Sequence, residues 1–231
     1  LVKTFQCVCG NTLYFENSRC LHCGRGLGFV PDQMRVAAFN TFPGMMADDL
    51  FSGRYRQCRN YIDHDTCNWM VAADDPEDFC RSCRLNDVIP NLADDRRLKL
   101  WYEVEKAKRR LMFTLMRLGL SVKSKRDSKN GLAFRILADA RLEMDRATSP
   151  VLDAIPTGYA GGFITLNLLE ADPAMREEMR KAVNESYRTV LGHCRHESGH
   201  YYFWRLVVDS RRDEFRRLFG DERVNYEQRL A

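Results

Sequence analysis

The chain has 231 residues, of which 45% are hydrophobic and 29% are charged, a balance typical of a globular protein with one core and room for a small module. No apolar run approaches the roughly 18 to 20 residues of a membrane span, and the first residues lack a secretory pattern, so we expect a cytoplasmic protein without a membrane partner. The formal net charge of +4 is too small to indicate nucleic acid. The basic clusters at 106–110 and 211–217 are interpreted as solvated helix faces.

Eight of the nine cysteines lie within the first 83 residues, in groups with short spacing. The groups are Cys7 with Cys9, Cys20 with Cys23, Cys58 with Cys67, and Cys80 with Cys83. Two thiolates a few residues apart can share one tetrahedral zinc ion at Zn–S distances of about 2.3 Å. Disulfides are the alternative, but the paired spacing and the missing secretory pattern favour a reducing compartment. The sequence therefore predicts two structural zinc sites.

Residues 1–29 are expected to form a zinc ribbon, with two knuckles separated by a hairpin-like segment. Gly10 and Gly24 each follow a cysteine directly, which suits a knuckle turn that requires a positive φ. Residues 30–57 contain scattered prolines and glycines, and we interpret them as an irregular connector.

Residues 58–92 are expected to form a second zinc knuckle module. Its first cysteines are more widely spaced than those of the ribbon, so His64 is a possible substitute ligand. We expect each zinc site to use sequential cysteines. An interleaved arrangement would use the same residues, and the spacing does not separate the two.

Residues 93–231 are expected to form a mainly helical domain with a small sheet, which gives the chain an α+β fold class. Asp94 or Asp95 is placed to cap a long helix. The apolar residues of this helix recur every three or four positions, and the pattern ends at Gly119.

A polar, basic loop at 121–130 separates the long helix from two strand candidates. Apolar residues alternate from Leu132 to Ile136, as in a half-buried strand. The second strand candidate spans residues 163–168, and Pro173 then opens another helix.

His196, Glu197 and His200 form the pattern H-E-x-x-H. On a helix, the two histidines project from the same face and can each direct a ring nitrogen at one zinc ion. Glu197 stands about 100° around the helix axis, where its carboxylate can take a proton from a water molecule that attacks a carbonyl group. His193, one turn earlier, is interpreted as a buried supporting residue rather than a ligand. A chance match with solvated histidines is the alternative to this predicted catalytic zinc site.

The strand with Ile164, Thr165, Leu166 and Asn167 is expected to be an exposed sheet edge above the catalytic zinc. Zinc peptidases commonly hold an extended substrate by pairing its backbone with such an edge. These four residues are therefore the predicted substrate-binding residues, with a plain core strand as the alternative.

The predicted catalytic site lacks a ligand, because catalytic zinc usually has three protein ligands beside water. Glu222 is the best placed candidate within the chain. Asp221 is the second candidate, and its alternative role is to cap a helix. A carboxylate beyond Ala231 is the remaining alternative.

Blocks of sequence along nearly the whole chain resemble the bacterial zinc-binding metallopeptidases that carry an N-terminal zinc ribbon. The blocks are residues 7–24, 80–86, 107–111, 131–134, 157–167, 187–202 and 219–222. The resemblance implies a zincin-like domain over residues 93–231, with zinc held by His196 and His200 and with Glu197 as the general base. It implies no known substrate. Tyr159 stands where the family pattern would have a histidine.

These features favour a zinc-dependent peptide-bond hydrolase that acts on a peptide or protein of unknown identity. The first alternative is a zinc-ribbon module that binds a protein partner, with a non-catalytic peptidase-like scaffold. The second is a nucleic-acid adaptor, which the mild charge disfavours.

Overall fold

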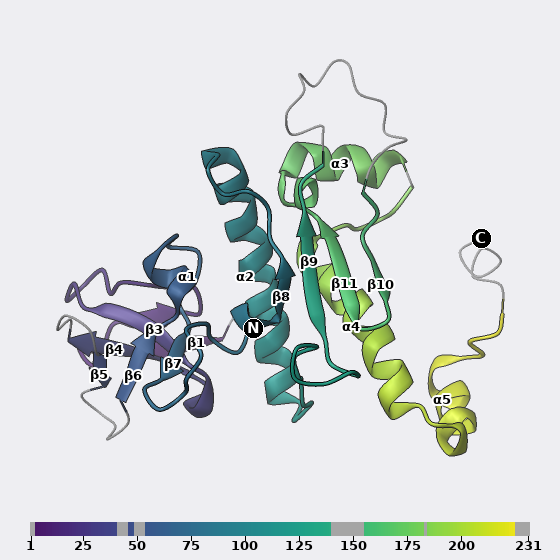
Figure 1. The fold of residues 1–231 in the computed structure, drawn as a ribbon, viewed down its shortest axis with the longest axis horizontal. Helices are drawn as coiled ribbons and strands as arrows, with labels where there is room; N and C mark the ends of the chain where they lie inside the picture. The colour runs from purple at the N-terminus through teal and green to yellow at the C-terminus, as the bar shows by residue number, and fades with distance from the viewer. Residues whose placement is uncertain (1–2, 41–45, 49–53, 140–154, 183, 225–231) are drawn as a thin grey trace.

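The computed structural model describes residues 3–40, 46–48, 54–139, 155–182 and 184–224. Figure 1 shows a long central helix, α2 (Asp95–Arg117), with the cysteine-rich part on one side and the C-terminal sheet with the other long helices on the other side. One cluster of buried hydrophobic residues runs through both parts, from Leu13 and Trp69 to Phe134 and Cys194. The separate helices and sheets fit the predicted α+β class.

Two sheets build the cysteine-rich part. In the first, β1 (Thr4–Gln6) and β2 (Thr12–Tyr14) pair in antiparallel orientation. The second is antiparallel with the strand order β3-β4-β5-β6-β7, and a short helix, α1 (Arg59–Ile62), lies between its last two strands in sequence. Its strands are β3 (Gly26–Val30), β4 (Arg35–Asn40), β5 (Met46–Asp48), β6 (Arg54–Gln57) and β7 (Met70–Ala72). This sheet curls back on itself, because Phe29 forms an isolated bridge with Trp69.

The interpretation of residues 30–57 as an irregular connector is wrong for the part of that segment that the structure describes. β3 and β4 form a hairpin whose 3-10 turn begins at Pro31 and is followed by Met34, with φ of 52°. Proline is tolerated at the first position of such a turn, since no hydrogen bond needs its missing N–H group. The other prolines and glycines that suggested an irregular segment lie outside the described residues.

The predicted bounds of α2 are confirmed. The Asp94 side chain accepts a hydrogen bond from the Arg97 backbone N–H group at 2.8 Å, so it caps the first turn. Gly119 has φ of 67°, a conformation that glycine adopts without the steric cost of a side chain, and the helix ends just before it.

The basic cluster at 106–110 is not the solvated helix face that we expected. Lys108 and Arg109 on α2 are buried, with exposed fractions of 0% and 1%. The helix is enclosed on two sides, by the cysteine-rich part and by the C-terminal sheet with α4, so little of its circumference remains for solvent. Buried charges on α2 therefore need partners inside the protein.

The C-terminal part contains a four-stranded sheet with the order β10-β11-β9-β8. Its strands are β8 (Asn86–Val88), β9 (Ala133–Leu137), β10 (Gly158–Ala160) and β11 (Phe163–Asn167). β11 and β8 run parallel to β9, whereas β10 is antiparallel to β11. Both predicted strands exist, and the alternating residues of the first one, Leu132, Phe134 and Ile136, are fully buried.

The expectation that residues 163–168 form an exposed edge is wrong. β11 lies between β9 and β10, and the Ile164, Leu166 and Asn167 side chains are buried. Gly161 and Gly162 turn the chain with positive φ, so β10 folds back and pairs with β11. The edge strand of the described sheet on this side is therefore β10.

Three further α-helices lie among the described residues after the sheet: α3 (Pro173–Ala182), α4 (Val190–Leu206) and α5 (Arg212–Phe219). α4 carries the H-E-x-x-H pattern and packs against α2, β10 and β11. The Thr189 hydroxyl oxygen caps α4 by accepting a hydrogen bond from the Gly192 N–H group at 3.0 Å. None of the described helices combines the length and the apolar content that a membrane crossing needs.

Candidate metal centres and active site

The first cysteine group sits at the tip of the ribbon. One sulfur atom from each of Cys7, Cys9, Cys20 and Cys23 lies within 4.8 Å of the others. Two knuckle turns create this arrangement, because the Gly10 N–H group donates to the Cys7 carbonyl at 2.9 Å and the Gly24 N–H group donates to the Cys20 carbonyl at 2.8 Å. Cys23 is exposed, so this group lies at the surface.

The second group consists of Cys58, Cys67, Cys80 and Cys83, and all four are buried. The structure therefore groups the cysteines sequentially and not in an interleaved arrangement. His64 does not belong to the group, and its ring instead contacts the edge of the Trp101 ring at a centroid distance of 5.7 Å.

The surroundings of the second group fit a thiolate zinc site. The backbone N–H groups of Trp69 and Cys80 donate to the sulfur atoms of Cys67 and Cys58, both at 3.3 Å. Arg109 is buried and donates to the Thr66 carbonyl, and its Nε atom has no hydrogen-bond partner among the described residues. Zinc with four thiolates carries a net charge of −2, which would balance this buried guanidinium group.

A buried ion pair joins the second cysteine group to α2. Lys108 Nζ donates to Glu105 Oε1 at 2.7 Å, and both side chains are fully buried. Glu105 Oε1 also accepts a hydrogen bond from the Asn86 amide at 3.0 Å, and its Oε2 atom lies 3.7 Å from Cys83 Sγ. The second metal centre and the long helix therefore share one polar network.

The two histidines of the H-E-x-x-H pattern converge on one point. The Nε2 atoms of His196 and His200 are 3.2 Å apart, and their rings cross at 81°. Two imidazole nitrogens that bind one tetrahedral zinc ion at about 2.0–2.1 Å are about 3.3 Å apart, so the described geometry fits shared ligation. Both side chains lie on the exposed face of α4, which leaves room for a ligand.

Glu197 lies on the adjacent, buried side of α4, with 8% of its surface exposed. Its carboxylate has no hydrogen-bond or ion-pair partner among the described residues. Glu197 directly follows His196, whose side chain is exposed to solvent. A carboxylate with free acceptor atoms beside a metal-binding histidine can accept a proton from a nearby water molecule.

Glu170 ties α4 to the sheet. This buried carboxylate contacts His193 Nδ1 on α4, accepts a hydrogen bond from Arg188 at 3.1 Å and accepts another from the Thr157 hydroxyl at 2.6 Å. Burial alone would raise the pKa of Glu170, but these three partners outweigh it and hold the pKa below its ordinary value. Because Thr157 directly precedes β10, the network fixes the helix relative to the edge strand.

The edge strand β10 reaches the histidine pair through Tyr159. The Tyr159 ring is nearly parallel to the His200 ring, with 16° between their planes and 6.2 Å between their centroids. The sequence pattern had marked position 159 only as a departure from the family pattern. In the structure its aromatic ring borders the His200 imidazole.

Comparisons with known proteins identify the family of the chain. Residues 97–231 match the family described as "Putative zinc-binding metallo-peptidase", and residues 4–94 match a zinc-ribbon domain. The chain belongs to this metallo-peptidase family. Together with the two cysteine groups, the two matches support zinc as its metal.

Relatives of the chain include an uncharacterized protein of Mycobacterium bovis and uncharacterized proteins from two strains of Mycobacterium tuberculosis. Each is 38% identical to the chain over 233 residues, and the match covers 99% of the chain. The chain spans 62% of the length of these curated relatives. No solved structure matches it.

The structure does not bring Glu222 to the histidine pair of this family member. The Glu222 carboxylate instead forms an ion pair with Arg216, at 2.7 Å, and Asp221 pairs with Arg223, also at 2.7 Å. No third metal-binding side chain joins His196 and His200 among the described residues. The alternative of a ligand beyond Ala231 lies outside the described residues.

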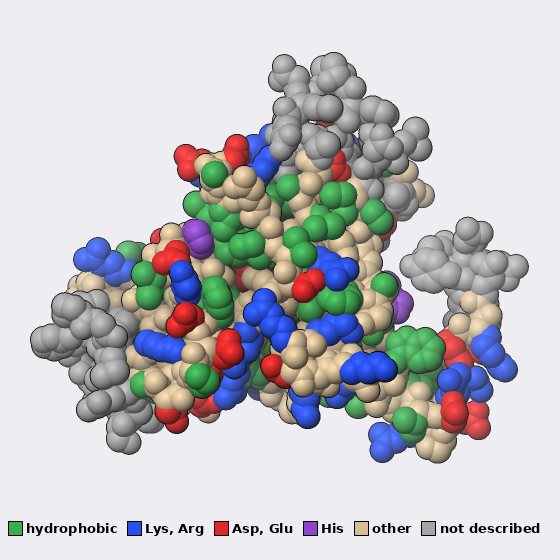
Figure 2. Space-filling view, in the orientation of Figure 1, with side chains coloured by type: hydrophobic (Ala, Val, Ile, Leu, Met, Phe, Trp, Pro, Cys, Tyr) green, Lys and Arg blue, Asp and Glu red, His purple; other side chains and the backbone are tan. Residues whose placement is uncertain are grey.

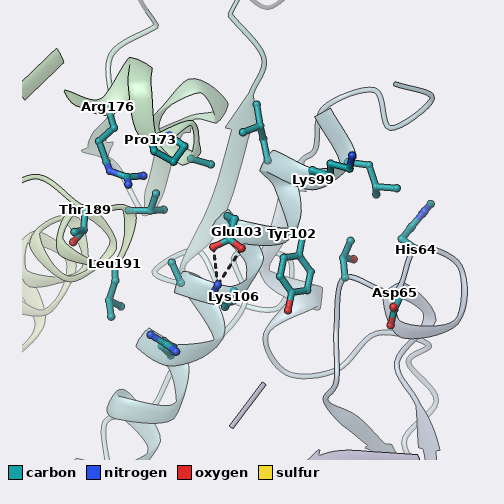
Figure 3. Close-up of a pocket in the computed structure, with 17 residues that line it drawn as sticks. His64, Asp65, Lys99, Tyr102, Glu103, Lys106, Pro173, Arg176, Thr189 and Leu191 are labelled. Atoms are coloured by element: carbon teal, nitrogen blue, oxygen red, sulfur yellow. Dashed lines mark hydrogen bonds and ion pairs between the residues drawn. The ribbon is translucent and has the colours of Figure 1, made fainter. Parts of the chain in front are cut away.

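A large cavity of about 810 Å³ lies away from the histidine pair, between the cysteine-rich part and the start of α4. Figure 3 shows His64 and Asp65 on one side of it, and Arg176 and Thr189 on the other. Between these two sides, Lys106 pairs with Glu103 at 2.7 Å. Neither the catalytic glutamate candidate nor the two histidines line this cavity, so its size is no guide to the active site.

Two functional features escaped the sequence reasoning. The first is the edge strand β10, although Gly161-Gly162 between two short apolar segments is a hairpin signal that could have indicated it. The second is the link between Glu170 and His193, which are 23 positions apart. No local pattern connects two such residues.

Proposed function

We propose that this chain is a zinc-dependent peptide-bond hydrolase, with His196 and His200 as zinc ligands and Glu197 as the general base. The observation that carries the proposal is the 3.2 Å distance between the two Nε2 atoms, on a helix that also presents the glutamate. A bound zinc ion would supply Lewis-acid activation of water and of the peptide carbonyl group.

The protein's own residues would then move the proton. The Glu197 carboxylate accepts a proton from the attacking water and returns it to the amine that leaves.

The substrate would bind along β10. An extended peptide can pair with the free backbone groups of an edge strand, and β10 is the described edge strand that borders the histidines. This proposal replaces the substrate-binding role predicted for Ile164, Thr165, Leu166 and Asn167.

Glu197→Gln tests the proposal. In the zinc-loaded chain, the variant should keep its fold and zinc content, but its rate of peptide hydrolysis should fall by about 10² to 10⁴, the usual contribution of a positioned general base. Glu178→Gln on the exposed face of α3 is a matched control and should leave the rate unchanged. An unchanged rate in Glu197→Gln would remove this residue from the reaction.

Metal counting separates this proposal from a ribbon module with a non-catalytic scaffold. A hydrolase should bind three zinc ions per chain, two of them in the cysteine groups, and should lose one when His196 and His200 are both replaced by alanine. The alternative would give two ions in both proteins. One observation favours the ribbon module: Leu21 in the zinc ribbon is 94% exposed, so a protein partner could bind there.

A further inference from the structure

We propose that a basic, aromatic cavity beside the histidine pair is a subsite for a carboxylate group of the peptide substrate. This proposal rests on the proposed function, since it names the class of peptide that the same site would accept. The cavity has a volume of about 640 Å³. Its lining includes the side chains of Lys125, Lys129 and Arg205, with Tyr159, Tyr201 and Trp204.

The cavity carries positive charge that the described residues do not neutralise. Its lining contains three cationic side chains and no Asp or Glu. None of the three forms an ion pair with a carboxylate among the described residues, although both lysines lie in a loop that also contains Asp127. Figure 2 shows Lys and Arg side chains gathered on the lower central part of the molecule, where Figure 1 places the segment between α2 and β9.

Backbone carbonyl groups hold two of the cations in place. Lys125 Nζ donates to the Gly161 carbonyl at 2.6 Å and to the Lys129 carbonyl at 3.1 Å. Arg205 donates to the Asn130 carbonyl at 3.0 Å, and the Tyr201 hydroxyl donates to the same oxygen at 3.2 Å. Carbonyl groups orient the cations without cancelling their charge, so the cavity stays attractive to an anion.

The wall of the cavity depends on glycine. A Cβ atom at Gly162 would lie 2.5 Å from the Gly131 carbonyl oxygen and 2.9 Å from Lys125 Nζ. Real Cβ atoms do not come this close to backbone atoms, so only glycine at position 162 lets the turn between β10 and β11 lie against the Gly131 carbonyl. The close approach of these segments is therefore built into the sequence.

The cavity adjoins the reacting centre. Tyr159 belongs both to the cavity and to the ring contact with His200. Trp204 follows His200 by four positions on α4, which places it about 6 Å further along the helix axis. Since an extended peptide advances about 3.3 Å per residue, a carboxylate in the cavity would belong to a residue about two positions from the bond that is cut.

Two sources can supply such a carboxylate: an Asp or Glu side chain within the peptide, or the free C-terminus of a short peptide. Both would be recognised by the same charge-assisted hydrogen bonds from Arg205 and the lysines. The aromatic rings of Tyr201 and Trp204 would pack against the aliphatic part of the bound residue.

Peptide binding to the full, zinc-loaded chain with Glu197→Gln tests the inference without hydrolysis. The probes are acetylated peptides without aromatic residues that carry Glu or Gln at successive positions, each with a free or an amidated C-terminus. Trp204 lines the cavity and is 67% exposed, whereas the other two tryptophans are buried, so tryptophan fluorescence reports binding. We expect one Glu position, or the free C-terminus, to lower the dissociation constant about five- to tenfold, and the difference to shrink as salt is added.

Arg205→Gln and Lys129→Gln should each reduce this preference to about twofold. Lys123→Gln is the matched control, because Lys123 is an exposed residue of the same loop that does not line the cavity, and it should leave the preference unchanged. Equal affinities for Glu and Gln peptides would overturn the inference, as would a preference that survives both cavity variants.

Hydrolysis of the same peptides by the unaltered chain separates the inference from the proposed function. Cleavage without a carboxylate preference would overturn the subsite and leave the hydrolase proposal standing. A carboxylate preference in binding, with no peptide cleaved, would refute the hydrolase proposal and keep the cavity as a carboxylate-binding site.

Discussion

Replacing Lys108 by methionine should destabilise the whole protein, because it would leave the Glu105 carboxylate buried without its cation. The two charged groups are 2.7 Å apart and fully buried. At an effective dielectric constant of about 20 they attract each other by about 6 kcal/mol, and the desolvation of both groups cancels much of this gain. Removal of one partner is far more costly than removal of both, so we expect Lys108→Met to lower the free energy of unfolding by about 3–5 kcal/mol.

Urea unfolding with excess zinc measures this loss. With a slope of about 3 kcal/mol per molar urea, the midpoint should fall by about 1–2 M. The double variant Lys108→Met with Glu105→Gln should recover a large part of the loss, because no buried charge is then left unpaired. Lys106→Met on the same helix is the matched control: its pair with Glu103 has exposed fractions of 28% and 45%, so its loss should be below about 1 kcal/mol. A similar small loss in Lys108→Met, or strict additivity in the double variant, would refute the reasoning.

Two further predictions concern the metal centres and the glutamate that positions α4. Cys80→Ser should release one zinc ion and lower the melting temperature, because the binding free energy of a structural metal is also folding free energy; an unchanged zinc content by elemental analysis would contradict this. The pKa of Glu170 lies below its ordinary value, so its stabilisation is present above the unfolded-state pKa of about 4.3 and is lost as the pH falls through the lower folded-state pKa. Glu170→Gln should therefore have a flatter stability curve than the parent protein below about pH 4.5, and parallel thermal unfolding curves would refute that assignment.

Local patterns in the sequence predicted local structure well. The two knuckle turns depend on glycines next to cysteines, and Gly10 and Gly24 do have positive φ values. Pro173 does open a helix, and the Asp172 side chain before it accepts hydrogen bonds from the N–H groups of Ala174 and Met175. These features depend on residues within one turn of each other, so the order of residues alone specifies them.

Features that depend on distant neighbours were not predictable. Lys108 and Arg109 belong to a basic run that is typical of a solvated helix face, yet the packing on both sides of α2 encloses them. β11 has the composition of either an edge or a central strand, and only its pairing with the three residues of β10 decides between the two. A third zinc ligand was placed at Glu222 because of its separation from His200, whereas Arg216 is near enough to pair with it.

The two cysteine groups have different relations to the proposed active site. The first group lies nearer the surface, because Cys23 is exposed and Cys9 is half-buried. The second is buried, and its Cys83 sulfur lies 3.7 Å from Glu105, which pairs with Lys108 on α2, the helix that also packs against α4. Four thiolates without a metal would place uncompensated charge next to that carboxylate, and protonated thiols would remove the sulfur charges that face the buried Arg109. A metal ion in the second group would therefore stabilise the helix on which α4 packs, and with it the position of the two histidines.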